Sequence, residues 1–361
     1  MVEPEHRPES EPRLEFEGLV ALHRPVLESH LAQLAAAPVL GLRQRHCLPK
    51  VCGPAAGQAA LAALLVEQNA SGGKRLRGIL PMAIVSACGG SSAAALDLAA
   101  AIELAHNGTL VHDDVQDNDR LRRGQPTLWT IFGIPQAINA GDALMVAPIG
   151  LLLRSTAIDP AVVNEIAALL AEALVETVRG QVADIGLREE PEVTLDLLTG
   201  IHLAKTAPLF GVCLQGSALV LGLPAAAQAQ AQLAASSLGL AFQVRDDLLD
   251  VAGNKGRGHA GADLREGKVT VPALFASQVA PAHEFLALRT DLARAASQLT
   301  LDDATVAHWV QWIVDHGGAQ RAQLWLAELL STAEEAGFAA FGPDGGQVVA
   351  ALCRRLARLD G

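Results

Sequence analysis

Three long stretches of the chain place apolar residues at the spacing of an α-helix. They cover residues 91–117, 161–185 and 226–253, and neither a proline nor a strand-like alternation interrupts them. Apolar residues recur at intervals of three and four along each stretch. The resulting apolar surface is nearly continuous, which is typical of helices inside a large bundle. The pattern therefore predicts an all-α protein.

The segments around these helices predict a single domain. Residues 1–14 are typical of a solvated tail, whereas residues 15–361 contain no long linker, low-complexity spacer or internal repeat. Two glycine-rich connectors, residues 69–78 and 252–268, also carry lysine and arginine. Such loops suit closure over an anion, although a solvated turn explains either loop taken alone.

Composition narrows the class of protein. Half of the 361 residues are hydrophobic, 3% are aromatic and tyrosine is absent, which favours helices packed through small side chains. A net charge of −12 and a pI near 5.4 argue against nucleic-acid binding. Five scattered cysteines indicate a reducing compartment, which predicts a cytoplasmic protein. The first residues do not resemble a signal peptide, and the apolar run Ala143–Leu153 is too short for a membrane span.

Two aspartate clusters end apolar helices and carry the candidate chemistry. In DDVQD, Asp113 and Asp117 are four residues apart, and Asp246 and Asp250 repeat that spacing in DDLLD. Each pair therefore projects from one helical face, where like charges destabilise a helix by roughly 0.2 to 0.5 kcal/mol. A hard cation such as Mg²⁺ would offset this repulsion, because it accepts carboxylate oxygens together with substrate phosphates. One such motif alone could be an exposed acidic face.

Seven motifs together resemble a known enzyme family. They are, in order, GGKRLRG, HDDVQDNDRLRRGQPT, NAGDALM, GQVAD, KTAPLF, FQVRDDLLD and GADLREGK. In this order they resemble the trans-isoprenyl diphosphate synthases of the polyprenyl synthetase family, in particular geranylgeranyl diphosphate synthases. The resemblance implies a helical bundle around a deep central cavity. It also implies head-to-tail condensation of isopentenyl diphosphate with an allylic diphosphate.

The resemblance assigns roles to residues at matching positions. Three magnesium ions would bridge the allylic diphosphate to the carboxylates of Asp113, Asp117 and Asp246. Outer-shell or water-mediated support would come from Asp114, Asp247 and Asp250. The same diphosphate would be neutralised by Arg122, Lys205 and Lys268. The diphosphate of isopentenyl diphosphate would be held by Lys74, Arg77, His106 and Arg123.

The same resemblance places two polar side chains beside the allylic cation, Thr206 and Gln243, and two in a supporting shell, Gln181 and Asp184. Magnesium and arginine would stabilise the charge that builds on the departing diphosphate. The carbocation left behind needs an apolar pocket without water, because water would trap it as an alcohol.

The chain departs from the family pattern at two positions. Gly78 follows GGKRLR where a proline is usual, which is expected to loosen the turn. His259 stands where a diphosphate-binding lysine is usual, and Lys255 or Arg257 would have to compensate. Because histidine is mostly neutral at pH 7, the second change predicts weaker binding or a pH-dependent rate.

Product length should depend on the depth of the pocket beneath the first cluster. Gly108 and Thr109 lie about 6 to 7.5 Å below Asp113 along the helix, and Ala105 is one turn deeper. Short-chain members of the family place an aromatic plug there. The small residues predict products of C20 or longer, although Phe210 on another helix could still form a floor.

Two other functions fit parts of the pattern. A class I terpene cyclase shares the bundle and one aspartate motif, but it pairs that motif with an Asn/Ser/Glu metal motif instead of DDLLD. A regulatory subunit of a heteromeric synthase would have lost its aspartate motifs, and this chain keeps both. A homodimer is implied by the resemblance alone.

Overall fold

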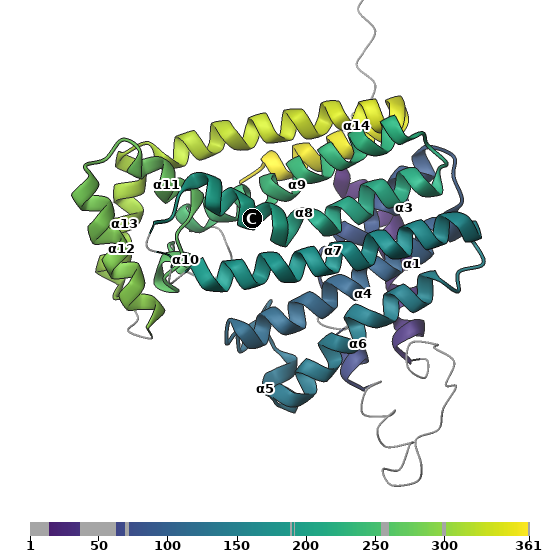
Figure 1. The fold of residues 1–361 in the computed structure, drawn as a ribbon, viewed down its shortest axis with the longest axis horizontal. Coiled ribbons are helices and arrows are strands. Elements are labelled where there is room, and N and C mark those ends of the chain that lie inside the picture. The colour runs from purple at the N-terminus through teal and green to yellow at the C-terminus, as the bar shows by residue number, and fades with distance from the viewer. Residues whose placement is uncertain are drawn as a thin grey trace, which may run out of the picture.

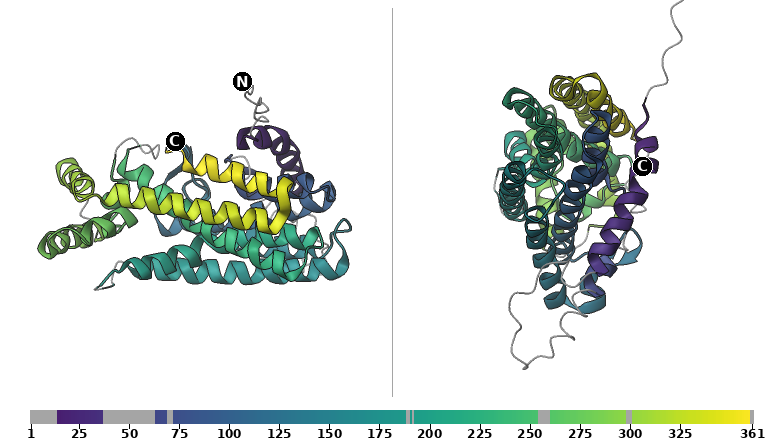
Figure 2. Two further views of the ribbon diagram at one scale, coloured as in Figure 1. Left: turned by 90° about the horizontal axis from the view of Figure 1, so that it is seen from above. Right: turned by 90° about the vertical axis from the view of Figure 1, so that its right-hand side faces the viewer.

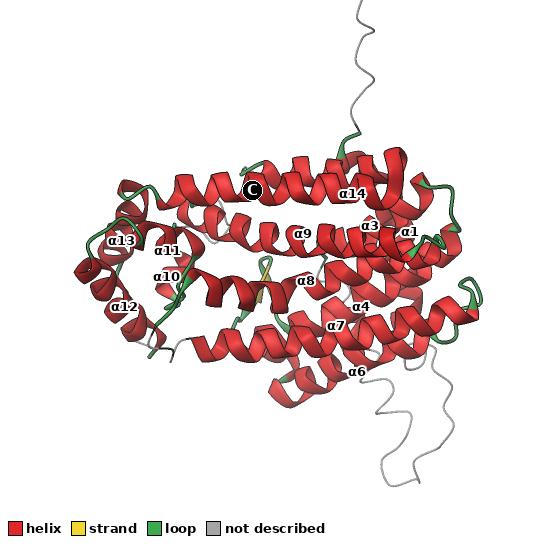
Figure 3. Ribbon diagram, turned by 45° about the horizontal axis from the view of Figure 1, so that its top comes forward, coloured by secondary structure: helices red, strands yellow, loops and turns green. Residues whose placement is uncertain are grey.

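The computed structural model describes residues 14–36, 63–68, 72–187, 190, 192–253, 260–297 and 301–359. Helices dominate this part of the chain (Figure 1), and a two-stranded hairpin, coloured yellow in Figure 3, follows the first aspartate cluster. The helices are α1 (Phe16–Ala36), α3 (Leu76–Ala87), α4 (Ser92–Gln116), α5 (Leu128–Phe132), α6 (Ile134–Leu152), α7 (Pro160–Gly186), α8 (Leu195–Val220), α9 (Ala225–Val251), α10 (Ala262–Arg265), α11 (Val271–Ser277), α12 (Ala282–Ala296), α13 (Asp303–Asp315) and α14 (Gly318–Ala357). The hairpin strands are β1 (Leu121–Arg122) and β2 (Gln125–Pro126).

The long helices run roughly side by side, and α8 lies between α7 and α9 (Figures 1 and 3). Helix α14 packs along α9, and helix α4 packs against α3, α6 and α8. The main hydrophobic core lies among these helices, and a smaller core joins α12 to α13. The all-α prediction is confirmed, and the three predicted stretches correspond to α4, α7 and α9. The proposed division into a tail and one domain stays a prediction, because residues 1–13 lie outside the described part.

Short side chains let the central helices approach one another closely. A Cβ atom at Gly180 of α7 would lie 2.3 Å from the backbone nitrogen of Lys205 on α8. A Cβ atom at Gly239 of α9 would lie 2.5 Å from the Cα of Ala207, also on α8. Since real Cβ contacts are never this short, both positions require glycine. The two glycines therefore fix the segment of α8 that carries Lys205 and Thr206.

Helix starts are capped by residues that the sequence supplies locally. Ser91, Asp159 and Thr194 stand just before α4, α7 and α8, and each side chain accepts a backbone N–H from the first turn. Such caps satisfy donors that have no partner inside the helix. Helix α3 is different, because its N-cap residue Arg75 has φ 51° and makes no side-chain cap bond.

One described helix, α8, is long and apolar enough to cross a membrane by length and composition. The sequence prediction considered only the uninterrupted apolar run Ala143–Leu153. It therefore missed α8, whose apolar stretch contains polar residues that lower its mean hydropathy only slightly. In the structure 67% of its most apolar window is buried inside the protein. That burial is what a helix at the centre of a bundle requires.

Helix α14 reverses its direction at Gly342, where φ is 66° and Pro343 follows. The parts before and after the kink pack on each other, so that a Cβ atom at Gly337 would lie 2.7 Å from the side chain of Val349. Figure 2 shows the two arms side by side. The reversal returns the C-terminal residues to the middle of the molecule.

Candidate active site

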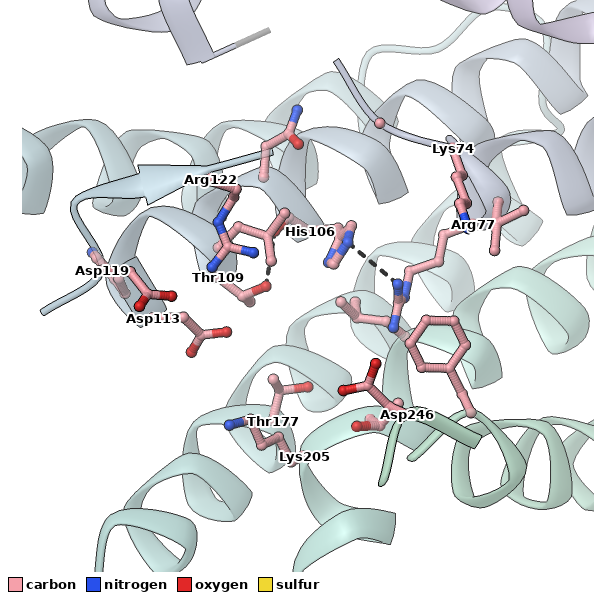
Figure 4. Close-up of a pocket in the computed structure, with 18 of the residues that line it drawn as sticks. Lys74, Arg77, His106, Thr109, Asp113, Asp119, Arg122, Thr177, Lys205 and Asp246 are labelled. Atoms are coloured by element: carbon pink, nitrogen blue, oxygen red, sulfur yellow. Dashed lines mark hydrogen bonds between the residues drawn. The ribbon is translucent and has the colours of Figure 1, made fainter. Parts of the chain in front are cut away.

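A cavity of about 1320 Å³ is lined by the C-terminal halves of α4, α7 and α9 and by the middle of α8. It is also lined by the loop before α3 and by the β1–β2 hairpin. Figure 4 shows labelled side chains from these elements pointing toward the same space. Charged and polar residues gather around this space, while Leu209 and Phe242 belong to its apolar lining. The arrangement suits a ligand with an anionic head and a hydrocarbon tail.

The first aspartate cluster lies at the end of α4. Asp113 lines the cavity, and burial raises the pKa of its carboxyl. Asp114 instead accepts a hydrogen bond from the Nε of Arg122 at 2.6 Å. Burial raises the pKa of Asp114 to about 6 in spite of this partner. Asp117 is the C-cap residue of α4 and lies 3.9 Å from the Nζ of Lys268.

The second cluster divides into a residue that lines the cavity and two that accept backbone N–H groups, of which Asp247 also lines the adjoining pocket. Asp246 lines the cavity from α9. Asp247 accepts the backbone N–H of Val271 at 2.8 Å, and Asp250 accepts that of Asp263 at 3.2 Å. Both of these carboxyls are buried. Asp247 thereby holds the start of α11, and Asp250 holds α10.

Polar side chains of α7 and α8 interact with one another and with α9 between the two aspartate clusters. The Nζ of Lys205 donates to Asp184 at 2.7 Å. Although burial alone would raise it, the pKa of the Asp184 carboxyl is lowered by the Lys205 ammonium. On the next residue, the Oγ1 of Thr206 accepts a hydrogen bond from the Nε2 of Gln243 at 2.8 Å. The predicted pair Thr206 and Gln243 is thus brought together at the cavity wall.

The hairpin after α4 positions two arginines. Its turn residues Arg123 and Gly124 have φ values of 54° and 76°, as a two-residue turn of this type requires. The carbonyl of Asp119 fixes the hairpin by accepting hydrogen bonds from Thr127 and from Trp129, each at 2.8 Å. The guanidinium of Arg123 in turn donates to the carbonyl of Gly72, so the hairpin and the glycine loop meet.

A second cationic group lines the same cavity near α3. The Nη1 of Arg77 lies 3.2 Å from the Nε2 of His106. Burial and the charge of Arg77 lower the pKa of His106 well below its usual value, so the ring is neutral and accepts this hydrogen bond. Lys74 lies beside them, and its pKa is lowered by burial and then by the positive charges of Arg355 and Arg245. Such crowding of cations favours an anion.

Sequence reasoning missed several residues that line this cavity. Arg245 and Arg355 belong to its lining, and neither was predicted. Arg245 directly precedes the second aspartate cluster, so its position was the available signal. Gln116 accepts a hydrogen bond from Gln181 at 2.9 Å, which joins α4 to α7. Nothing in the sequence pattern indicated this pair.

The carboxylates fit a hard divalent cation. Within the described ranges, no three His, Cys, Asp or Glu side chains are gathered closely enough to hold a metal ion by themselves. Mg²⁺ does not require such a cage, because it keeps several waters and takes one or two carboxylates plus substrate phosphates. Asp113 and Asp246 offer oxygen ligands to one cavity, and Asp117 and Asp246 line an adjoining one. Lys268 adds a cation there; burial opposes its charge, but Asp117 and Glu266 raise its pKa.

The predicted chain-length residues are only partly at the cavity. Thr109 lines it, but Gly108 faces α6, where a Cβ atom would lie 2.8 Å from Met145 and 3.0 Å from the carbonyl of Gly141. Ala105 is fully buried and is absent from the lining. The idea that Gly108 leaves room for substrate is therefore corrected. Gly108 lets α4 and α6 approach each other.

The two departures from the family pattern have different outcomes. Gly78 was expected to loosen a turn, but it lies in the first turn of α3, buried, and its N–H donates to Glu103 at 2.8 Å. A proline there would lack this donor. His259, Lys255 and Arg257 lie outside the described residues.

Comparisons with known proteins agree with this geometry. The polyprenyl synthetase model matches residues 59–304. The chain is 39% identical over 208 residues to the geranylgeranyl diphosphate synthase of Mycobacterium tuberculosis, which covers 57% of this chain and 59% of that protein. It is 37% identical over 261 residues to the farnesyl diphosphate synthase of Geobacillus stearothermophilus, covering 70% and 87% of the two chains. The first relative is thus matched over less than two thirds of its length.

The matches to solved structures cover nearly the whole of this chain and of the matched chains. The geranylgeranyl pyrophosphate synthetase of Geoglobus acetivorans superposes with a TM-score of 0.78 at 25% identity, covering 94% of this chain and 99% of that one. A polyprenyl synthase of Caulobacter crescentus, solved with calcium and isoprenyl diphosphate, superposes with a TM-score of 0.75 at 26% identity. It covers 97% of this chain and 99% of that structure.

Proposed function

Since the chain belongs to the polyprenyl synthetase family, we propose that it is a trans-prenyltransferase that condenses isopentenyl diphosphate head-to-tail with an allylic diphosphate. One observation carries the proposal. Asp113 of α4 and Asp246 of α9 face the same cavity, and Lys205 lies at its wall as well (Figure 4). Two carboxylates and a cation around one space suit a metal-bound diphosphate.

The allylic diphosphate would sit between the two aspartate clusters. Asp113, Asp117 and Asp246 would hold three magnesium ions, which supply electrostatic stabilisation to the departing diphosphate. The related Caulobacter structure is a complex with calcium and isoprenyl diphosphate, which supports the combination of a divalent cation with a prenyl diphosphate. Two lysines, Lys205 and Lys268, would bring further positive charge to the same oxygens. Arg122 would contribute after leaving Asp114, its present partner.

The second substrate, isopentenyl diphosphate, would bind at the cations near α3. Lys74, Arg77 and Arg123 supply positive charge there, and neutral His106 steadies the Arg77 guanidinium. This subsite and the aspartate clusters line one cavity. The double bond of isopentenyl diphosphate can therefore face the allylic carbon as its diphosphate leaves. Formation of the new carbon–carbon bond is followed by loss of a proton, for which the released diphosphate is the base at hand.

The walls of the cavity would protect the allylic cation. Thr206 and Gln243 form a hydrogen-bonded polar pair at the cavity wall, whereas Leu209 and Phe242 belong to its apolar lining. An apolar interior excludes water that would trap the cation. The division between polar pair and apolar lining matches the two parts of a prenyl diphosphate.

We place the product at C20 or longer. The relatives named above include both a geranylgeranyl and a farnesyl diphosphate synthase, so family membership alone leaves the length open. Support for the longer product comes from Thr109, a small residue at the cavity wall one turn below Asp113. An aromatic side chain in its place would shorten the space available to the chain.

We also infer a cytoplasmic homodimer. Apolar side chains are exposed along α7, where Val178, Val182 and Ile185 line the cavity. Val175, three residues before Val178, is exposed outside the cavity. Val146 on neighbouring α6 is exposed as well. An apolar face of this kind is typical of an interface between protein chains.

One assay separates this function from its alternatives. Purified protein is mixed with Mg²⁺, labelled isopentenyl diphosphate and allylic primers of several lengths, and the products are separated by chromatography. Elongated prenyl diphosphates support the proposal. Cyclic hydrocarbons from the allylic substrate alone would indicate a class I terpene cyclase. Activity that requires a second protein would indicate a regulatory subunit.

A further inference from the structure

The peptide group between Arg77 and Gly78 lacks both of its usual helical partners. Gly78 lies in the first turn of α3, where N–H groups have no acceptor inside the helix. Arg75 precedes the helix with φ 51° and makes no side-chain cap bond. At the other end of the same peptide group, the carbonyl of Arg77 would normally accept from residue 81, which is a proline without an N–H.

Two side chains from other helices supply the missing hydrogen-bond partners. The carboxylate of Glu103 on α4 accepts the Gly78 N–H at 2.8 Å. The thiol of Cys213 on α8 donates to the Arg77 carbonyl at 3.2 Å, and shares its hydrogen with the carbonyl of Leu209 at 3.1 Å. Burial raises the pKa of Cys213, so the thiol keeps this hydrogen at neutral pH. One peptide group is therefore held at both ends by α4 and α8.

The packing around this peptide group leaves little freedom. Glu103 and Cys213 are 2% and 0% exposed, respectively. A Cβ atom at Gly78 would lie 2.6 Å from the Cγ of Glu103, so only glycine allows the two helices this approach. The second carboxylate oxygen of Glu103 lies 3.5 Å from the Nη1 of Arg75. Disturbing a buried carboxylate with these partners costs free energy, because its oxygens would lose hydrogen bonds that water cannot replace.

We propose that Glu103 and Cys213 are positioning residues, which fix the Arg77 backbone and thereby aim its guanidinium at the diphosphate of isopentenyl diphosphate. The guanidinium lies 3.2 Å from His106 and stacks over the ring of Phe210 at 4.8 Å. A guanidinium group presents its N–H donors in one plane. It binds a diphosphate through several of them only when the group is held in the correct orientation. This proposal depends on the proposed function only in identifying the ligand as isopentenyl diphosphate.

Steady-state kinetics of the full-length protein with Mg²⁺ test this role, with the two substrates varied separately. Cys213→Ala removes the donor and is expected to raise KM for isopentenyl diphosphate by about fivefold to tenfold. Cys213→Ser retains a donor, so its KM for isopentenyl diphosphate should stay close to that of the wild type. Glu103→Gln keeps an acceptor for Gly78 and should be milder than Glu103→Leu. KM for the allylic substrate should stay within about twofold throughout, because its subsite lies at the aspartate clusters.

A matched control is Cys88→Ala. Cys88 also directs its thiol at a backbone carbonyl, that of Phe341 at 3.7 Å, but at the far end of α3. This variant should leave both KM values unchanged. Equal KM changes for both substrates, or no difference between Cys213→Ala and Cys213→Ser, would overturn the positioning role and leave only a packing role.

A binding measurement separates failure of this inference from failure of the proposed function. Inorganic diphosphate is titrated into each protein by calorimetry without divalent metal, so that binding reports the cations near α3. Weaker binding to Cys213→Ala than to Cys213→Ser supports the inference even if no prenyl transfer is found. Absence of diphosphate binding to the wild-type protein, or equal binding to both variants, contradicts it.

Discussion

Lys205 of α8 and Asp184 of α7 form an ion pair of 2.7 Å beside the cavity that both aspartate clusters line. Asp184 is not itself a predicted metal ligand, and its contact with Lys205 links it to the cavity. The pair joins two helices whose approach depends on Gly180. A lysine held in this way presents its charge from a fixed position.

Replacing Asp184 by asparagine is expected to lower the catalytic rate about tenfold or more. The amide side chain can still accept a hydrogen bond, but the fixed negative charge that orients the Lys205 ammonium is lost. The rate is measured with saturating concentrations of both substrates. Asp196→Asn, an exposed position at the start of α8, is the matched control and should be neutral. A similar rate in both variants would contradict the role of the pair.

Two neighbouring aspartates are expected to respond differently to the same substitution. Asp246→Asn should lower activity by about a hundredfold or more and raise the Mg²⁺ concentration needed for half-maximal rate, because it removes a carboxylate from the cavity. Asp247→Asn should mainly lower stability, by about 1 kcal/mol, because the neutral amide oxygen accepts the N–H of Val271 more weakly than the carboxylate does. Activity assays and urea unfolding of both variants provide the comparison. Identical behaviour of the two would contradict the division seen in the structure.

The chain-length residue is expected to be Thr109 and not Gly108. Thr109→Phe would place a ring in the cavity and shorten the products toward C15. Gly108→Phe would collide with Met145 and Gly141 on α6 and destabilise the protein by at least about 1 to 3 kcal/mol. Chromatography of labelled products and thermal unfolding distinguish the two effects. If Thr109→Phe made the same products as the wild type, the hydrocarbon tail would have to follow another path.

The stability of the protein should fall between pH 7.5 and pH 5 partly because of His202. Burial lowers the pKa of this side chain to about 4, whereas it is about 6.5 in an unfolded chain. Below pH 6.5 the unfolded chain takes up a proton that the folded protein does not, so the free energy of unfolding decreases as the pH falls through this window. The contribution at pH 5 is about 2 kcal/mol.

The comparison of wild type with His202→Gln measures this effect. Urea unfolding at both pH values should show a smaller decrease for the variant. His283→Gln, at an exposed position of α12, should retain the full decrease. An equal decrease in wild type and His202→Gln would mean that His202 is protonated in the folded protein.

The exposed face of α7 predicts how the dimer can be broken. Val175 is 71% exposed and does not line the cavity. Val175→Glu should place a charge in the interface and halve the mass measured by analytical ultracentrifugation. Leu286→Glu, on α12 with 67% exposure, should leave the mass unchanged. A wild-type protein that sediments as a monomer would contradict the proposed dimer.

The helices were predictable because their apolar pattern is nearly continuous. A helix that is buried on most sides, such as α9, shows its character without knowledge of its neighbours. The start of α3 was harder to predict, since the glycines and cations of residues 69–78 favour a loop. In the structure, Arg77 and Gly78 are helical, and the partners that allow this come from Glu103 and Cys213, far away in the sequence.

The residues that form the site were predictable from the sequence, but the directions of their side chains were not. Motif positions identified the residues that meet at the cavity, such as Asp113 and Asp246. Spacing alone did not reveal that Asp247 and Asp250 turn toward backbone N–H groups. Gly108 and Thr109 are adjacent, yet they point about 100° apart around α4. Which of them meets α6 depends on Gly141, a residue that no pattern on α4 specifies.

The reversal of α14 has a practical consequence for work with this protein. It brings Arg355 and Leu356 to the lining of the cavity, and Arg354 donates to the carbonyl of Leu14 at 2.8 Å. The C-terminal end of the described chain therefore emerges beside the cavity. An affinity label or fused reporter that begins close behind Leu359 would start beside the cavity, so kinetic constants should be measured after its removal.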